Sequence, residues 1–516
     1  MSEETAPTVP TAYGSVSGLV SGGITAFLGI PYAAAPAGDL LFAAPQAPEP
    51  WEGVRVADTH GPTAPKPPLG GRLGEITSDP DIVGEDWLNL NVWTPDTTAS
   101  LPVLVWIHGG GFTTGSSAVP TYDGATFARD GVVCVSINYR LGVYGFGYLP
   151  DAPQPANRGL LDQIAALTWV RENIAAFGGD PGNVTVAGES AGAMSVLALL
   201  SRDDGLFHKA IVQSGTAHLG QTTTDATKVL KAVADKLGIQ ATTAALAGVN
   251  TEELLTAQNT VSADISQSPD ATKYGASTLA SCGLSFMPVI DADVLSSRPI
   301  DAIADGAGSN IPLLMGTTTE EFRLFIVTTV LVALDTKLAY NNHLKAYSIP
   351  TGTWDEYEKG DTNTYPRNAA CGIACALLTD RMFRIPTYRV AEARTTTPGA
   401  APTYLYEFGW RSPVTPNDRR VKIGACHSVD LPFAWDTLAL DDSKKLTGNH
   451  APQTLATALH SAWASFAKTG TASWDPYDTT TRQVMAYADN DTTTHQAVSD
   501  PRKSERQWWD GHLTTG

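Results

Sequence analysis

One pentapeptide restricts the fold of this chain more than any other stretch: GESAG, at Gly188–Gly192. It joins Asn183–Gly188, whose β-branched residues are typical of a strand, to Ser190–Leu200, whose alanines and leucines favour a helix. A turn that leads directly from a strand into a helix is so tight that side chains on both sides of the serine would collide, so both glycines are needed. An ordinary glycine–serine turn is the alternative, but the flanking elements favour a strained, exposed serine.

Strands and helices alternate on both sides of this turn. Apolar, β-branched runs at Leu101–His108 and Gly131–Asn138 predict strands that are buried on both faces. Leu160–Phe177 carries apolar residues at helical spacing and ends at the breaker GGDP, which predicts a helix. Further strands are predicted at Lys209–Gln213, Ile311–Gly316 and Thr403–Phe408. The alternation predicts an α/β fold in which helices flank a mostly parallel central sheet.

The chain reads as one domain over residues 1–516, because no linker between independent units is visible. Residues 222–285 and 328–398 are rich in helix formers, and we expect them to be helical insertions over the carboxyl edge of the sheet, where such folds bind ligands. A division into a core and a regulatory subdomain is the alternative. Residues 1–12 are acidic and rich in Pro and Thr, which predicts a flexible tail without the features of a signal peptide.

Charge and cysteine content narrow the classes of function. With 53 acidic and 34 basic residues the net charge is −19, which argues against nucleic acid or an anionic membrane as a partner. The five cysteines are too sparse for a disulfide framework, and Cys371 and Cys375 are spaced like neighbours on a helix rather than like zinc ligands. We therefore expect five free thiols, no metal or cofactor, and a cytoplasmic protein.

A second glycine-rich motif supplies what a serine nucleophile needs. A hydroxyl attacks a carbonyl efficiently only where a base accepts its proton and hydrogen-bond donors stabilise the oxyanion that forms. The sequence HGGGF begins at His108, at the end of a predicted strand, and bare glycines let backbone N–H groups converge on one oxygen. The N–H groups of Gly110, Gly111 and Ala191 are the candidate oxyanion hole. A flexible glycine loop is the alternative.

Shorter motifs run nearly from end to end of the chain. They are FLGIPYA at 27–33, WEGVR at 51–55, EDWLNLNV at 85–92, NYRLG at 138–142, FGGDP at 177–181, QSG at 213–215, FAKTG at 466–470 and WWDG at 508–511. Together with both glycine motifs, they make the chain resemble the type-B carboxylesterases, a family that includes bacterial p-nitrobenzyl esterases and animal cholinesterases. The resemblance implies the α/β-hydrolase fold and a serine esterase.

The resemblance also implies the remaining catalytic residues. The family's acid lies in a glycine-led stretch after a strand; its sixth residue here is Glu321, with Glu320 as the nearest rival. The family's histidine loop is matched by GACHSVDLPF, which contains His427, and the order Ser, Glu, His is that of α/β-hydrolases. Ser214 is expected to support the acid through a hydrogen bond. Glu189 is expected to be a buried structural carboxylate.

The expected reaction is hydrolysis of a small-molecule carboxylic ester through an acyl-enzyme on Ser190, by a monomer or a homodimer. A carbamate or aryl-amide hydrolase with the same triad is the alternative, and a non-catalytic, adhesion-type relative is a remote one. Several aromatic residues are candidates for the substrate pocket or equally for the core: Phe112, Phe286, Phe322, Phe325 and Trp435.

Two departures from the family pattern lie near the N-terminus. Trp87 stands where the family has a cysteine, so the family's N-terminal disulfide cannot form. Leu41 replaces an arginine that pairs with the family's equivalent of Glu85, so Glu85 must have another donor, lie near water or be protonated. Neither departure involves a candidate catalytic residue.

Overall fold

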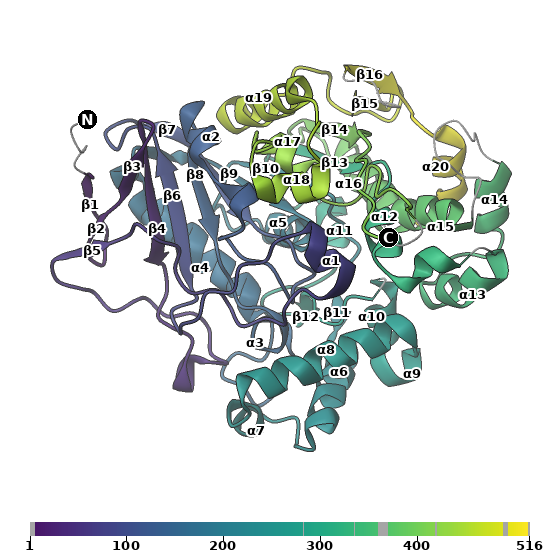
Figure 1. Cartoon of the computed structure of the whole chain (residues 1–516), viewed down its shortest axis with the longest axis horizontal. Helices are drawn as coiled ribbons and strands as arrows, with labels where there is room; N and C mark the ends of the chain where they lie inside the picture. The colour runs from purple at the N-terminus through teal and green to yellow at the C-terminus, as the bar shows by residue number, and fades with distance from the viewer. Residues whose placement is uncertain are drawn as a thin grey trace.

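The computed structural model describes residues 6–281, 283–334, 336–359, 370–417, 420–488 and 494–513 (Figure 1). Its main feature is an eleven-stranded sheet among these residues. The strand order is β16 (His495–Ser499), β15 (Gln483–Tyr487), β14 (Thr403–Phe408), β13 (Leu313–Thr318), β10 (Lys209–Gln213), β9 (Gly179–Glu189), β7 (Leu101–Ile107), β8 (Val133–Ile137), β6 (Asn89–Thr94), β4 (Ile24–Pro31) and β3 (Leu19–Ser21).

The seven strands from β8 to β15 in this order pair in parallel, and antiparallel strands complete both edges. A mostly parallel sheet flanked by helices is the predicted fold class, which is thereby confirmed. Two smaller sheets join β1 (Thr8–Pro10), β2 (Ser15–Ser17) and β5 (Val54–Val56), and β11 (Gln221–Thr222) and β12 (Val289–Ile290).

Alternate residues of the central strands point to opposite faces of the sheet and into separate cores. On β7, Val103 and Val105 belong to one apolar core, whereas Leu104 and Trp106 belong to the other. The first core is covered by α4 (Arg158–Asn173), α5 (Ala191–Arg202), α11 (Pro299–Ala304) and α16 (Ile385–Thr395), and the second by α2 (Ala125–Arg129), α17 (Leu431–Ala434) and α19 (Gln453–Thr469). The strands are thus buried on both faces, as their continuous apolar runs require.

The remaining helices gather mainly in two groups. In Figure 1 the teal helices α6–α10 lie together at the bottom, and α13 and α14 lie at the right beside α20. Their bounds, with those of the other helices, are α1 (Gly71–Ile76), α3 (Gly142–Phe146), α6 (Thr223–Leu237), α7 (Thr243–Ala247), α8 (Thr251–Gln267), α9 (Ala271–Tyr274), α10 (Ala276–Ala280), α12 (Arg323–Val327), α13 (Lys337–Ala346), α14 (Thr353–Lys359), α15 (Ala370–Thr379), α18 (Asp441–Thr447) and α20 (Lys503–Trp509). Short 3-10 turns occur at Gly38–Leu40, Pro120–Tyr122, Ile174–Phe177 and Val330–Ala333, and a π-helical turn, Asp380–Arg384, joins α15 to α16.

Several element boundaries differ from the prediction, and the largest shift among the strands lies next to the serine turn. The strand expected at Asn183–Gly188 begins at Gly179, so the GGDP breaker itself enters the sheet. The preceding helix ends at Asn173, and a 3-10 turn covers the rest of its predicted length. Within the expected flexible tail, Thr8–Pro10 form β1 and pair with β2, so that expectation is corrected for these three residues: ladder hydrogen bonds hold them.

The structure also bears on the expectation of five free thiols. Cys134, Cys371, Cys375 and Cys426 are free thiols, and Cys282 lies outside the described residues. In the part of the chain that the structure describes, no helix combines the length and apolar character needed to cross a membrane.

Glu85 is exposed, so it lies near water, while Trp87 is buried and donates its indole N–H to the carbonyl of Gly84 (2.6 Å).

Candidate active site

Ser190 lies at the turn between β9 and α5 in a strained backbone conformation. Its φ is 55° and its ψ is −123°, a region that residues with a side chain rarely occupy. The flanking glycines permit the turn: a Cβ on Gly188 would lie 2.5 Å from the carbonyl carbon of Gly192, and a Cβ on Gly192 would lie 2.0 Å from the oxygen of Ile107. The serine is therefore held at the carboxyl end of β9, with its side chain at the start of α5.

Glu321 lies in the turn after β13, and its carboxylate is buried and fully bonded. Oε1 accepts the hydroxyl of Ser214 at 2.6 Å and the backbone N–H of Thr318 at 2.8 Å. Oε2 lies 2.5 Å from Nδ1 of His427. A carboxylate oxygen at this distance favours the imidazole tautomer that carries its proton on Nδ1 and leaves Nε2 free to accept one.

His427 brings the histidine loop against the serine turn. Its Nε2 lies 3.0 Å from Oε1 of Glu189 but without hydrogen-bond geometry, so among the described residues Nε2 makes no hydrogen bond. Ser428 donates its hydroxyl to the same Glu189 oxygen at 2.6 Å. Burial alone would lower the pKa of His427, but the facing carboxylates of Glu189 and Glu321 outweigh it and raise the pKa above its ordinary value. Burial also raises the pKa of Glu189.

The glycine loop after β7 adjoins this cluster. A Cβ on Gly109 would lie 3.1 Å from Cβ of Ser190 and 2.6 Å from Oε2 of Glu189, so the loop and the serine turn are in direct contact. Gly110 and Gly111 have φ values of 112° and 61°, which glycine adopts without strain. Within the described part of the chain, the backbone N–H groups of Gly110, Gly111 and Ala191 donate no hydrogen bond. Unbonded N–H groups near the serine are what the predicted oxyanion hole requires, and that role stays a prediction.

Two phenylalanine rings pack against the imidazole. The ring centroids of Phe383 and Phe325 lie 5.0 and 5.3 Å from that of His427, and Phe322 lies 5.2 Å from Phe325. Phe383 was not predicted from the sequence; it lies on the π-helical turn, a feature often found at functional sites.

The other aromatic candidates belong to the cores. Phe112 is buried against Phe146 at 4.8 Å, and Phe286 is likewise buried. Trp435 packs edge-on against Trp106 at 5.2 Å on the opposite face of the sheet.

The structure separates the two rival carboxylates. Glu320 accepts the backbone N–H of Ala425 at 2.9 Å and lies 3.8 Å from Arg323 and 3.5 Å from Arg411, so it is not the carboxylate that contacts the imidazole. The contact between Glu189 and His427 was not predicted from the sequence, which indicated only a buried structural carboxylate at Glu189. The Ser190 hydroxyl and the imidazole are not hydrogen-bonded in this structure, and the catalytic roles of these residues stay predictions.

Comparison with known proteins identifies the family. The model of the carboxylesterase family matches residues 5–509. The para-nitrobenzyl esterase of Bacillus subtilis (strain 168) is 37% identical over 516 residues, 97% of each chain, and the phenmedipham hydrolase of Pseudarthrobacter oxydans is 35% identical over 91% of this chain and 92% of its own. Among solved structures, a thermophilic PNB esterase matches with a TM-score of 0.81 at 34% identity, covering 98% of this chain and 99% of that one. A carboxylesterase of Geobacillus stearothermophilus matches with a TM-score of 0.82 at 33% identity, covering 98% and 100%.

These matches extend over nearly the whole chain and include named esterases, which removes the non-catalytic, adhesion-type alternative. They also confirm the α/β-hydrolase fold. The chain belongs to the carboxylesterase family and is a carboxylic ester hydrolase.

Proposed function

We propose that the chain hydrolyses small-molecule esters through an acyl-enzyme on Ser190, with His427 as the base and Glu321 as the acid of the triad. One observation carries the proposal: the buried chain of hydrogen bonds from Ser214 through Glu321 to Nδ1 of His427, which leaves Nε2 unbonded. A serine turn that touches the same cluster through Glu189 supports it. Hydrogen bonds to a nucleophile are often formed only when substrate binds, so the present separation of hydroxyl and imidazole is compatible with this role.

Each half of the reaction uses the same groups. The Ser190 oxygen bonds to the ester carbonyl carbon while Nε2 of His427 takes the hydroxyl proton, and the carbonyl oxygen becomes an oxyanion. The free N–H groups of Gly110, Gly111 and Ala191 stabilise this charge. The C–O bond to the alcohol then breaks as the imidazolium returns its proton to the leaving oxygen. Water repeats these steps on the acyl-serine and releases the acid.

Glu189 adds an electrostatic contribution to the same steps. The imidazolium that forms after proton transfer lies 3.0 Å from its carboxylate, on the side opposite Glu321. A cation between two buried carboxylates is stabilised in the transition state more than the neutral imidazole is in the ground state. We therefore assign Glu189 to the catalytic electrostatics rather than to the fold alone.

One observation favours carbamate hydrolysis as a second candidate function. The relative from Pseudarthrobacter oxydans, 35% identical to this chain, is named a phenmedipham hydrolase. The same triad and oxyanion donors serve both carbonyl classes, so pocket shape decides the preference. Turnover of a p-nitrophenyl ester, of the p-nitrophenyl carbamate with the same alkyl group, and of the p-nitroanilide with the same acyl group would separate the two. The cytoplasmic location and the monomeric or homodimeric state stay predictions from the sequence.

The test compares wild type with Ser190→Ala on p-nitrophenyl esters of increasing acyl length. We expect at least about a 10⁴-fold loss of kcat without loss of the fold, because the covalent route is removed. Ser201→Ala, on the same helix with its hydroxyl bonded to the carbonyl of Ala198, is the matched control and should retain full activity. An organophosphate probe should add mass to Ser190 alone. Full activity in Ser190→Ala, or labelling elsewhere, would refute the proposal.

A further inference from the structure

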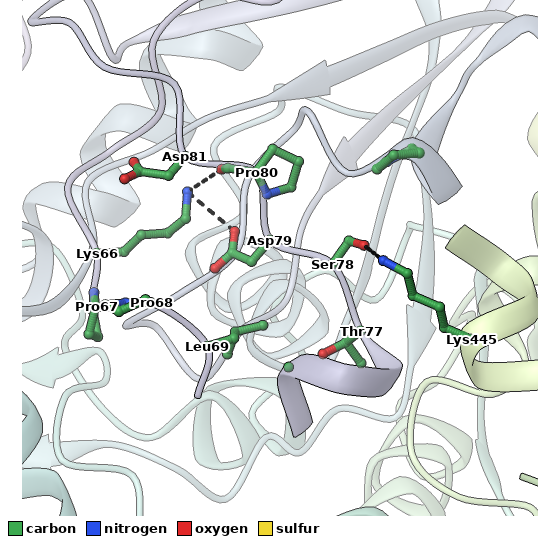
Figure 2. Close-up of a pocket in the computed structure, with 12 residues that line it drawn as sticks. Lys66, Pro67, Pro68, Leu69, Thr77, Ser78, Asp79, Pro80, Asp81 and Lys445 are labelled. Atoms are coloured by element: carbon green, nitrogen blue, oxygen red, sulfur yellow. Dashed lines mark hydrogen bonds and ion pairs between the residues drawn. The ribbon is translucent and has the colours of Figure 1, made fainter. Parts of the chain in front are cut away.

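Asp79 lies in the segment 77–81, between α1 and β6, and forms a buried ion pair with Lys66. Nζ of Lys66 lies 3.2 Å from Oδ1 of Asp79, and the two side chains are only 2% and 4% exposed. Nζ also donates to the carbonyl of Pro80 at 2.7 Å, so one ammonium group holds two successive residues (Figure 2). A buried pair of this kind is costly to break, because removing either partner leaves an uncompensated charge.

One side of this segment borders a cavity. The cavity has a volume of about 450 Å³ and is lined by the ion pair and by Pro67, Pro68, Leu69, Pro120 and Lys445 among others. At Ser78 the segment is tied to α18, since the Ser78 hydroxyl bonds to Asp442 and accepts from Lys445 at 2.8 Å.

From this segment Asp79 reaches the glycine loop that adjoins Ser190. Its Oδ2 accepts the backbone N–H of Gly115 at 3.0 Å. The other side of that peptide bond, the carbonyl of Thr114, lies directly against Gly110: a Cβ on Gly110 would be only 2.1 Å from the Thr114 oxygen. The N–H groups of Thr113 and Thr114 in turn donate to the carbonyl of Gly110 at 3.1 and 2.9 Å.

Gly115 also contacts the start of the loop. A Cβ on it would lie 2.3 Å from the carbonyl oxygen of Gly109 and 2.6 Å from Nδ1 of His108. The carboxylate of Asp79 thus holds the Thr114–Gly115 peptide, which packs against Gly109 and Gly110. A hydrogen bond to an ionised acceptor is about twice as strong as one between neutral groups, which suits an anchor point.

We propose that Asp79, held by Lys66, is a positioning residue that fixes the N–H groups of Gly110 and Gly111 for the oxyanion; this inference rests on the proposed function. Oxyanion donors act only when they lie within hydrogen-bond distance of the developing charge. A displacement of about 1 Å at such a site costs about 100-fold in rate. Neither Asp79 nor Lys66 contacts the candidate catalytic residues directly, so both act through the Thr114–Gly115 peptide.

The experiment compares Asp79→Ala and Asp79→Asn with wild type. Measured quantities are kcat and KM for a p-nitrophenyl ester and the inhibition constant of a trifluoromethyl ketone, which forms an oxyanion on the serine. We expect kcat of Asp79→Ala to fall about 10- to 100-fold, with KM changed less than about threefold and inhibitor affinity weakened in parallel with kcat. Asp79→Asn keeps an acceptor oxygen for Gly115 but loses the charge, so its loss should be smaller.

Ser78→Ala is the matched control, because it removes the tie to α18 and leaves the bond to Gly115 intact. It should retain kcat and inhibitor affinity even where thermal stability falls. If Asp79→Ala does not fold, Asp79→Asn alone decides the question. Wild-type kcat and inhibitor affinity in a folded Asp79→Asn or Asp79→Ala protein, with Ser190 still labelled by an organophosphate, would overturn the inference. Failure of the proposed function itself appears instead as activity that survives Ser190→Ala.

Discussion

The contact between Glu189 and His427 makes a directional prediction for the substitution Glu189→Gln. The carboxylates of Glu189 and Glu321 raise the pKa of His427 above its ordinary value. Catalysis needs the neutral imidazole, so the rate is lost as pH falls through this raised pKa. Glu189→Gln keeps the shape and removes one negative charge. It should therefore lower the pKa and move the acid limb of kcat/KM to lower pH.

The expected size of the shift follows from the distance. Nε2 and Oε1 are 3.0 Å apart, and the two delocalised charges are centred about 4 Å apart, which gives about 4 kcal/mol at an effective dielectric constant of about 20. That energy corresponds to about three pKa units. Burial raises the pKa of Glu189 itself, so the carboxylate is ionised in only part of the population and the shift is smaller. We expect the limb to move down by about one to two units.

The assay is the pH dependence of kcat/KM from about pH 5 to 10, which reports the free enzyme. The plateau at high pH should also fall about tenfold, because the imidazolium of the transition state loses one of its two carboxylate neighbours. Glu253→Gln, an exposed residue of α8, makes the same change of net charge far from the site and should leave the profile unchanged. An acid limb that stays in place in folded Glu189→Gln protein, or that moves to higher pH, refutes the electrostatic coupling.

Three further substitutions test other parts of the structure. Glu321→Gln should lower kcat about 10⁴-fold with the fold intact, because the amide no longer holds the imidazole in its working tautomer; steady-state kinetics check this. Ser214→Ala removes one of the donors to that carboxylate and should cost about tenfold in kcat while KM stays within about threefold. Arg140→Met should lower the free energy of unfolding by about 3–5 kcal/mol in urea, because Asp162, 2.7 Å away and fully buried, loses its cation.

Much of the fold follows from local sequence pattern. The strands at Lys209–Gln213 and Thr403–Phe408 have the predicted bounds, because each is a short run of residues that suit a buried strand. The π-helical turn Asp380–Arg384 has no such pattern. Arg384 binds Asp380 through two hydrogen bonds of 2.6 Å, and Arg502, 122 residues beyond Asp380 along the chain, reaches the same carboxylate at 3.2 Å. Tertiary contacts of this range are invisible to periodicity.

The residues of the candidate site likewise fall into those that a local sequence pattern predicts and those that it does not. The strained Ser190 follows from GESAG together with the strand and helix predicted on its two sides, because a tight turn between them needs both glycines. Glu321 and His427 came from resemblance, because nothing in their spacing distinguishes them from other acids and histidines. The approach of Glu189 to the imidazole depends on how the loop that carries His427 packs over β9, which no local pattern encodes. The sequence therefore predicts the covalent chemistry better than the charges that tune it.

Those charges explain why the oxyanion loop needs an anchor. Glu189, Glu321 and Asp430 are all buried around one imidazole, and burial raises the pKa of Asp430 as it does that of Glu189. Such a cluster favours the imidazolium of the transition state, but its negative potential opposes the oxyanion that forms at the same moment. The oxyanion must therefore be stabilised by N–H dipoles that all point at it. The stabilisation from a neutral N–H group falls steeply as its hydrogen-bond distance and angle depart from the optimum. Because the carboxylates around the His427 imidazolium carry excess negative charge, catalysis depends strongly on where the glycine loop places its N–H groups. The hydrogen bond from Gly115 to Asp79 fixes that placement.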